Sequence, residues 1–215
     1  MLNNFELIPI FPTGLIKIKF KDHHKYNFPD IEKKVNKPPE WECSVNTSFP
    51  FIDEHDTLVP PIVNKNLMTD LKSSIVEVFK ELNMPTNFEF IQFWYNTYRD
   101  NQGQEKHNHL TWVGSKNLYW CGIYYNKNSS PTKFHRDPGW YECQRFPNYE
   151  NSPMDYVLSA GYSPPVEDGD ILLFPPHLQH SVESQPYHKD KMRMTFSFNI
   201  DLLSLSVNGH EILPS

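Results

Sequence analysis

The sequence has few cysteines, no long apolar run and no excess of positive charge. Only three of its 215 residues are cysteines, and none belongs to a Cys-x-x-Cys pair, which argues against a zinc knuckle or a disulfide framework. Free thiols in a reducing cytoplasm are the simplest interpretation. The chain lacks about 18 consecutive apolar residues, which excludes a membrane-spanning helix. The N-terminus lacks a basic segment followed by an apolar one, so we expect no signal peptide.

The charge of the chain is negative. Its 20 basic and 26 acidic residues give a formal net charge of −6, and the sequence pI is about 5.9. This balance argues against binding of nucleic acid or of an anionic membrane through bulk electrostatics. We therefore expect a cytoplasmic protein with no nucleic-acid or membrane partner.

The residues that are abundant favour β-structure. Aromatic residues make up 14% of the chain, and 19 residues are prolines, which is typical of strands separated by turns. Between residues 67 and 82 the apolar residues instead recur every three or four positions, which predicts one amphipathic helix. Many short strands after a single helix predict a mainly β sandwich or jelly roll, with the helix packed outside a sheet.

One long strand is predicted over residues 88–98, because apolar and polar residues alternate there. The alternation places Phe88, Phe90 and Gln92 on one side together with Trp94, Asn96 and Tyr98. No repeat or linker interrupts the chain. We therefore predict a single domain over residues 1–215, in which residues 1–85 supply strands and the supporting helix and residues 86–215 supply the β core.

Three histidines are candidates for metal binding. His107 and His109 are two positions apart, so on an extended backbone their side chains point the same way and can chelate one ion. On its own this spacing is equally typical of a solvated turn. His180 follows an apolar strand, where it is either a third ligand or a half-buried histidine bonded to a carbonyl. Imidazoles are common ligands of divalent transition metals.

Arg193 is a candidate for binding an acid. It lies on a strand whose other residues are mainly apolar, and a buried arginine needs a partner. That partner is either an internal carboxylate or the carboxylate of a small ligand held by the guanidinium. Thr195 lies on the same face and can add a hydroxyl donor.

The order of these motifs is more specific than any one of them. It reads His107-Asn108-His109, Gly122-Ile123-Tyr124-Tyr125, Gly169-Asp170-Ile171-Leu172-Leu173-Phe174-Pro175, His180, and Arg193-Met194-Thr195-Phe196-Ser197-Phe198-Asn199. This order, over roughly residues 90–201, resembles the 2-oxoglutarate/Fe(II)-dependent oxygenases. It is most similar to a small prolyl-hydroxylase-like branch with a His-x-His motif.

The resemblance implies a double-stranded β-helix, a cupin-like jelly roll, with Fe(II) at its open end and 2-oxoglutarate chelating the metal. It implies a dioxygenase, a hydroxylase that oxidises a C–H bond and releases succinate and CO2. His107 and His180 would be metal ligands, Arg193 would bind the distal carboxylate, and Thr195 would assist it. Tyr124 would also contact the co-substrate, with Trp94 and Trp120 as further walls of the cavity.

The third metal ligand differs from the pattern of the wider superfamily, which has His-x-Asp or His-x-Glu. Here the second position is His109. Either His109 is the third ligand, or water or a carboxylate takes that place. His135-Arg136-Asp137 supplies a His-x-Asp one strand later, so Asp137 is the alternative.

Two other functions remain open at this level. A cupin-type dioxygenase could use the three histidines without 2-oxoglutarate, and a jelly roll without metal could be a binding module. For the enzyme we expect a small-molecule or peptidyl substrate, selected by a long connection over residues 137–165. An exposed edge strand would allow two chains to pair as a homodimer.

Overall fold

The structure is a computed structural model, and it describes residues 5–10, 13–28, 45–49, 65–99, 101–110, 118–135, 161–184, 192–204, 206–207 and 210–211. One long helix, one short 3-10 helix and thirteen strands lie in these ranges. Their bounds are β1 Phe5–Ile10, β2 Thr13–Lys19, η1 His23–Lys25, β3 Asn46–Thr47, α1 Lys65–Glu81, β4 Phe88–Tyr98, β5 Gln104–His107, β6 Leu118–Lys127, β7 Lys133–His135, β8 Gly161–Tyr162, β9 Asp170–Phe174, β10 His180–Val182, β11 Arg193–Leu202, β12 Ser206–Val207 and β13 His210–Glu211.

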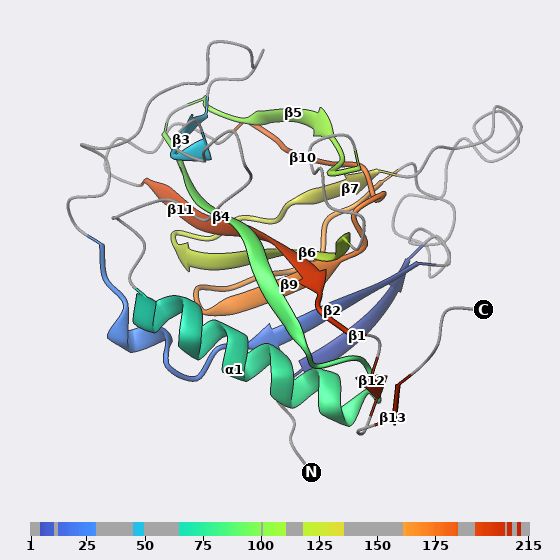
Figure 1. The fold of residues 1–215 in the computed structure, drawn as a ribbon. Helices are drawn as coiled ribbons and strands as arrows, with labels where there is room; N and C mark the ends of the chain where they lie inside the picture. The colour runs from blue at the N-terminus through green and yellow to red at the C-terminus, as the bar shows by residue number, and fades with distance from the viewer. Residues whose placement is uncertain are drawn as a thin grey trace, which may run out of the picture.

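Two antiparallel sheets form the body of the protein (Figure 1). The large sheet has the strand order β1-β2-β9-β6-β11-β4-β3, and the small sheet has the order β5-β10-β7-β8. Between them lies a core of buried side chains, to which β6 and β9 contribute Ile123 and Phe174 and the small sheet contributes Phe134. Two sheets packed over a shared core are the expected jelly roll. The fold-class prediction is confirmed.

Helix α1 covers the other face of the large sheet. It buries Leu67, Leu71, Ile75, Val78 and Phe79, and these pack on phenylalanines of the sheet. The helix ends at Glu81. Two residues later Asn83 is left-handed, with φ 53°, and the Met84 N–H then donates to the Phe79 carbonyl at 2.8 Å. The predicted helix is confirmed. No helix within the described ranges combines the length and apolarity needed to cross a membrane.

Strand β4 departs from the predicted alternation. In its pairing with β11, Gln92 is opposite Asn199 but Phe90 is opposite Ile200, so Ile91 is an extra residue. This is a β-bulge, and it reverses the face of every residue before it. Phe88 and Phe90 therefore pack under the helix, whereas the prediction placed them on the side of Gln92. The side chains from Gln92 to Tyr98 keep the predicted face.

Candidate metal and co-substrate site

Three histidines meet where β5 pairs with β10. His107 ends β5, His180 begins β10, and the two are direct partners in the antiparallel register. His109 follows in a turn, where its N–H donates to the Pro176 carbonyl at 3.0 Å. The ring centroids are 4.3, 5.1 and 5.6 Å apart for the pairs 107–180, 109–180 and 107–109. One ligand atom from each ring lies within 4.8 Å of the other two, so small ring rotations would close them around one divalent ion.

In each of the three rings, Nδ1 makes a hydrogen bond to another group of the protein. His107 and His180 each donate from Nδ1 to the backbone carbonyl two residues earlier, at 2.8 and 3.0 Å. His109 donates from Nδ1 to Oδ1 of Asn199 at 2.7 Å. Because the acceptors are carbonyl oxygens, Nδ1 carries the proton in each neutral ring. Nε2 then keeps its lone pair, as in histidines that bind metals.

Burial keeps the three imidazoles neutral. It lowers the pKa of His107, lowers the pKa of His109 to about 4, and lowers the pKa of His180 well below its ordinary value. The mutual repulsion of the three rings when charged acts in the same direction on His109 and His180. A neutral imidazole is the form that binds metal. The chemistry of the donor set therefore fits a divalent transition ion.

The metal-free protein is expected to lose stability as the pH falls from 6.5 toward about 4. An unfolded chain protonates His109 at its ordinary pKa of 6.5, whereas folded His109 stays neutral down to about pH 4. The unfolded state therefore binds more protons in this window, and the free energy of unfolding decreases as pH falls. Urea denaturation across the window measures this. The control is His109→Gln, which removes one of the three buried imidazoles and should make the dependence shallower, with the remainder due to His107 and His180; parallel profiles for both proteins would contradict the assignment.

Arg193 is a buried cation with unused donors. Its side chain is 3% exposed, and its guanidinium lies over the rings of Tyr98 and Tyr125, at 4.6 and 5.8 Å. Nη2 donates to the Ser130 carbonyl at 3.1 Å, but Nε and Nη1 have no partner among the described residues. No described carboxylate pairs with it. A buried guanidinium with two unsatisfied N–H groups is costly and fits a bidentate carboxylate ligand.

The three histidines and Arg193 line the same hollow. Arg193 and Thr195 line it together with all three histidines, and Trp94, Asn96 and Tyr98 of β4 complete one wall. Arg193 and Thr195 share a face because they are two residues apart on β11. No described side chain bonds the Thr195 hydroxyl. The structure thus brings together five of the six predicted site residues.

Tyr124, the sixth, lies on the opposite face of the large sheet. Its ring stacks on Phe196 with a centroid distance of 5.9 Å, and its hydroxyl bonds Nδ1 of His23 at 2.7 Å. The predicted contact with the co-substrate is therefore a wrong assignment by one residue, because side chains alternate along β6. Tyr125 faces the other way and lies beside Arg193, and its hydroxyl donates to Oγ1 of Thr132 at 2.9 Å. Trp120 lies near Phe79 of the helix, so it is not a wall of the hollow either.

The alternative ligand set does not come together in the described residues. Asp137 lies outside them. His135 does not belong to the histidine cluster; its Nε2 bonds Oγ of Ser181 at 2.8 Å. His177 is exposed in the turn after β9.

Two residues behind His109 were not predicted individually. Asn199 accepts from His109 with its oxygen and donates with its nitrogen to Oε1 of Gln92. This chain of bonds fixes which end of the Asn199 amide faces the histidine, and hence the tautomer of the ring. The alternation of β11 could have indicated Asn199, because it lies six residues beyond Arg193 and therefore on the same face of the strand.

Comparison with known proteins agrees with this geometry. The family described as "Putative 2OG-Fe(II) oxygenase" matches residues 92–199, which is half of the chain. No curated protein matches the sequence. HygX from Streptomyces hygroscopicus, solved with nickel and 2-oxoglutarate bound, is 14% identical with a TM-score of 0.54, over 89% of this chain and 84% of that one.

Two further solved structures share the fold. A Pseudomonas putida prolyl-4-hydroxylase is 9% identical with a TM-score of 0.53, over 88% of this chain and 93% of that one. OsALKBH1 is 12% identical with a TM-score of 0.56, over 86% and 97%. The likeness in structure supports the fold, and the family match supports the activity. The chain belongs to the 2OG-Fe(II) oxygenase family and is a dioxygenase that depends on Fe(II) and 2-oxoglutarate.

Proposed function

We propose that His107, His109 and His180 bind Fe(II) through their Nε2 atoms, and that Arg193 and Thr195 bind the distal carboxylate of 2-oxoglutarate. The proposed substrate is a small molecule or a peptidyl side chain that is hydroxylated at a C–H bond. The observation that carries the proposal is the shared hollow, which joins three neutral imidazoles to a buried guanidinium with two unpaired donors.

The charge of the ligands supports the pairing of this metal site with this co-substrate. Three imidazoles are neutral ligands, so they leave the full double charge of a divalent ion uncompensated. 2-Oxoglutarate carries two carboxylates: one can approach the ion, and the other can meet Arg193, which has no described acid beside it. When 2-oxoglutarate binds, the metal ion and the Arg193 guanidinium thus each gain a carboxylate as a partner.

The groups of this chain bind and orient, while the cofactors supply the oxidation. When bound, Fe(II) and 2-oxoglutarate provide the chemistry by which O2 gives succinate, CO2 and one oxygen atom for the substrate. The rings of Tyr98 and Tyr125 lie beside the guanidinium and help to keep water from it. Asn199 holds His109 in the tautomer that leaves Nε2 free.

A second cavity beside the same histidines is the proposed substrate pocket. Its lining includes His107 and His109 as well as Phe49 and Trp94. The rings of Phe49 and Trp94 pack edge to face, with their centroids 5.2 Å apart. The rest of the lining is polar and consists of the amides of Gln92, Gln104, Asn108 and Asn199 and the carboxylate of Glu105. Such a lining suits an apolar group flanked by hydrogen-bonding groups. One solved structure with this fold contains hygromycin B and another is a prolyl-4-hydroxylase, which supports the same two classes of substrate.

The proposal is tested by adding 2-oxoglutarate to the anaerobic Fe(II) protein. We expect a weak visible charge-transfer band that saturates at one equivalent, and succinate formation when O2 is admitted. Chelation by the 2-oxo acid is the source of the band, so the three-histidine cupin alternative predicts no band. A non-catalytic binding module predicts neither band nor succinate. Iron analysis before the titration excludes an empty metal site as the reason for a negative result.

A further inference from the structure

Arg193 is held in place by a loop that lies outside the hollow. Residues 128–130 form the first part of the connection between β6 and β7. The Ser130 carbonyl accepts from Nη2 of Arg193 at 3.1 Å, and the side-chain amide of Asn128 donates to the carbonyl of Met192 at 2.8 Å. The loop therefore contacts both the guanidinium and the backbone directly before it. Asn128 has φ 48°, a left-handed conformation that asparagine adopts more readily than most residues.

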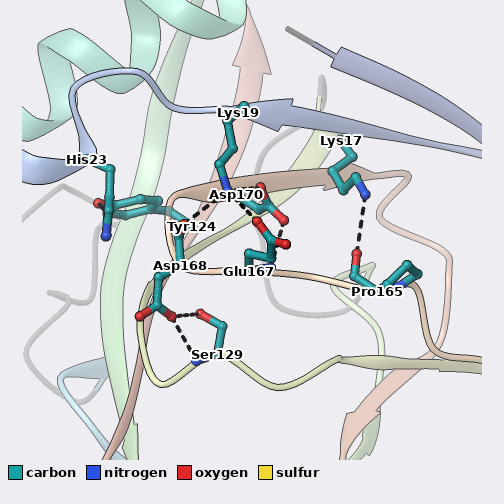
Figure 2. Close-up of polar contacts among 9 residues, drawn as sticks. All are labelled: Lys17, Lys19, His23, Tyr124, Ser129, Pro165, Glu167, Asp168 and Asp170. Carbon is teal, nitrogen blue, oxygen red and sulfur yellow. Dashed lines mark hydrogen bonds and ion pairs between the residues drawn. The ribbon is translucent and has the colours of Figure 1, made fainter.

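Asp168 supports this loop. Its carboxylate accepts from the backbone N–H groups of Asn128 and Ser129, at 3.2 and 2.9 Å, and from the Ser129 hydroxyl at 2.5 Å. Figure 2 shows Asp168 reaching Ser129 from the turn before β9. Three hydrogen bonds donated to one exposed carboxylate thus fix two consecutive residues of the loop.

The turn that carries Asp168 is itself anchored to the large sheet. Nζ of Lys19 donates to the Asp168 carbonyl at 3.2 Å, to Asp170 at 3.1 Å and to Glu167 at 3.2 Å, contacts that Figure 2 draws together. The Gly169 N–H donates to the Tyr125 carbonyl at 2.8 Å. With the turn bonded to β2 and β6, Asp168 is a rigid support for the loop.

We propose that Asp168 is a positioning residue for the co-substrate: by fixing the 128–130 loop, it holds Arg193 with Nε and Nη1 free for the distal carboxylate of 2-oxoglutarate. This inference rests on the proposed function, in which Arg193 binds that carboxylate. Without Asp168 the loop loses three hydrogen bonds, so the Ser130 carbonyl is held less firmly against Nη2 of Arg193. Binding the carboxylate then requires ordering the loop and the side chain, which lowers affinity.

The test compares two 2-oxo acids. 2-Oxobutyrate has the metal-chelating end of 2-oxoglutarate and lacks the distal carboxylate, so Arg193 does not contribute to its binding. Both acids are titrated into the anaerobic Fe(II) protein, with the charge-transfer band as readout, for wild type, Asp168→Ala, Asp168→Asn and Glu167→Ala. Glu167→Ala is the matched control, because it removes the same charge from the same turn, gives up only one of the three Lys19 contacts, and leaves the bonds from Lys19 to Asp168 and Asp170 and from the loop to Asp168 in place. Melting temperature and Fe(II) affinity are measured in parallel.

We expect Asp168→Ala to weaken 2-oxoglutarate binding by about three- to twentyfold and to leave 2-oxobutyrate and Fe(II) binding unchanged. Asp168→Asn keeps one acceptor oxygen and should fall between wild type and Asp168→Ala; Glu167→Ala should match wild type. Equal weakening of both acids would show a merely structural role and overturn the inference, as would unchanged 2-oxoglutarate binding in Asp168→Ala. If wild type binds the two acids equally, the role of Arg193 is wrong and the inference falls with the proposed function.

Discussion

Replacing His180 with alanine is expected to abolish stoichiometric Fe(II) binding and, with it, succinate formation. His180 is buried and packs against the other two rings and Phe174, so its removal takes away one of three donors and leaves no described group to replace it. Loss of residues that only support ligands already weakens metal binding by about ten- to a hundredfold, and loss of a ligand should exceed this. Iron content and Fe(II) affinity under anaerobic conditions measure the effect.

Two histidine variants make this result specific. His177→Ala removes an exposed imidazole three residues away and should bind Fe(II) like wild type. His135→Ala tests the alternative in which His135 and Asp137 hold the metal. If His135→Ala loses the iron while His180→Ala retains it, the assigned ligand set is wrong. Circular dichroism of each variant confirms that the jelly roll is folded.

Replacing Arg193 with methionine is expected to weaken 2-oxoglutarate binding by at least about a hundredfold. Two hydrogen bonds to a charged group contribute about 1.5–3 kcal/mol each, so their loss corresponds to about 3 kcal/mol or more. Binding of 2-oxobutyrate should be unchanged. Arg193→Lys keeps the charge but not the planar fork, so it should be intermediate. The measurement is the same charge-transfer titration, and equal loss of both acids would contradict a specific contact with the distal carboxylate.

The same substitution should not lower the stability of the ligand-free protein. In the folded chain Nε and Nη1 are buried without partners, so Arg193 is maintained at a cost that a methionine of similar length does not have. Without ligand, we expect the melting temperature of Arg193→Met to equal or exceed that of wild type. Added 2-oxoglutarate should raise the melting temperature of wild type but not that of Arg193→Met. A residue that destabilises the ligand-free fold yet is needed for binding is typical of a functional site.

The parts of the site that regular strands carry were predictable from the sequence. The alternation of β11 places Arg193 and Thr195 on one face, and the structure agrees. The histidine at position 180 follows a fully buried strand and begins the next one. For β6 the contact of Tyr124 came from the family resemblance, and alternation could not correct it, because Tyr124 and Tyr125 are adjacent, both aromatic and both buried. Periodicity cannot determine which of two equivalent neighbours faces the site.

The remaining features depend on contacts between distant segments. The bulge at Ile91 is set by pairing with β11, and nothing in residues 88–98 alone indicates it. Asp168 is exposed, and in the sequence it is one of several acids in a polar turn. Its role depends on a loop about 40 residues earlier, whose approach follows from the sheet order. The sequence therefore predicts the groups that we propose to bind the metal and the co-substrate, but not the residues that hold these groups in place.

An anaerobic crystal structure with Fe(II) and 2-oxoglutarate tests the central claim most directly. We predict Nε2 of His107, His109 and His180 at about 2.0–2.2 Å from one ion, and the distal carboxylate of 2-oxoglutarate within about 3 Å of the Arg193 guanidinium. An ion held by a carboxylate such as Asp137 in place of His109, or a 2-oxoglutarate whose distal carboxylate lies away from Arg193, would contradict the account.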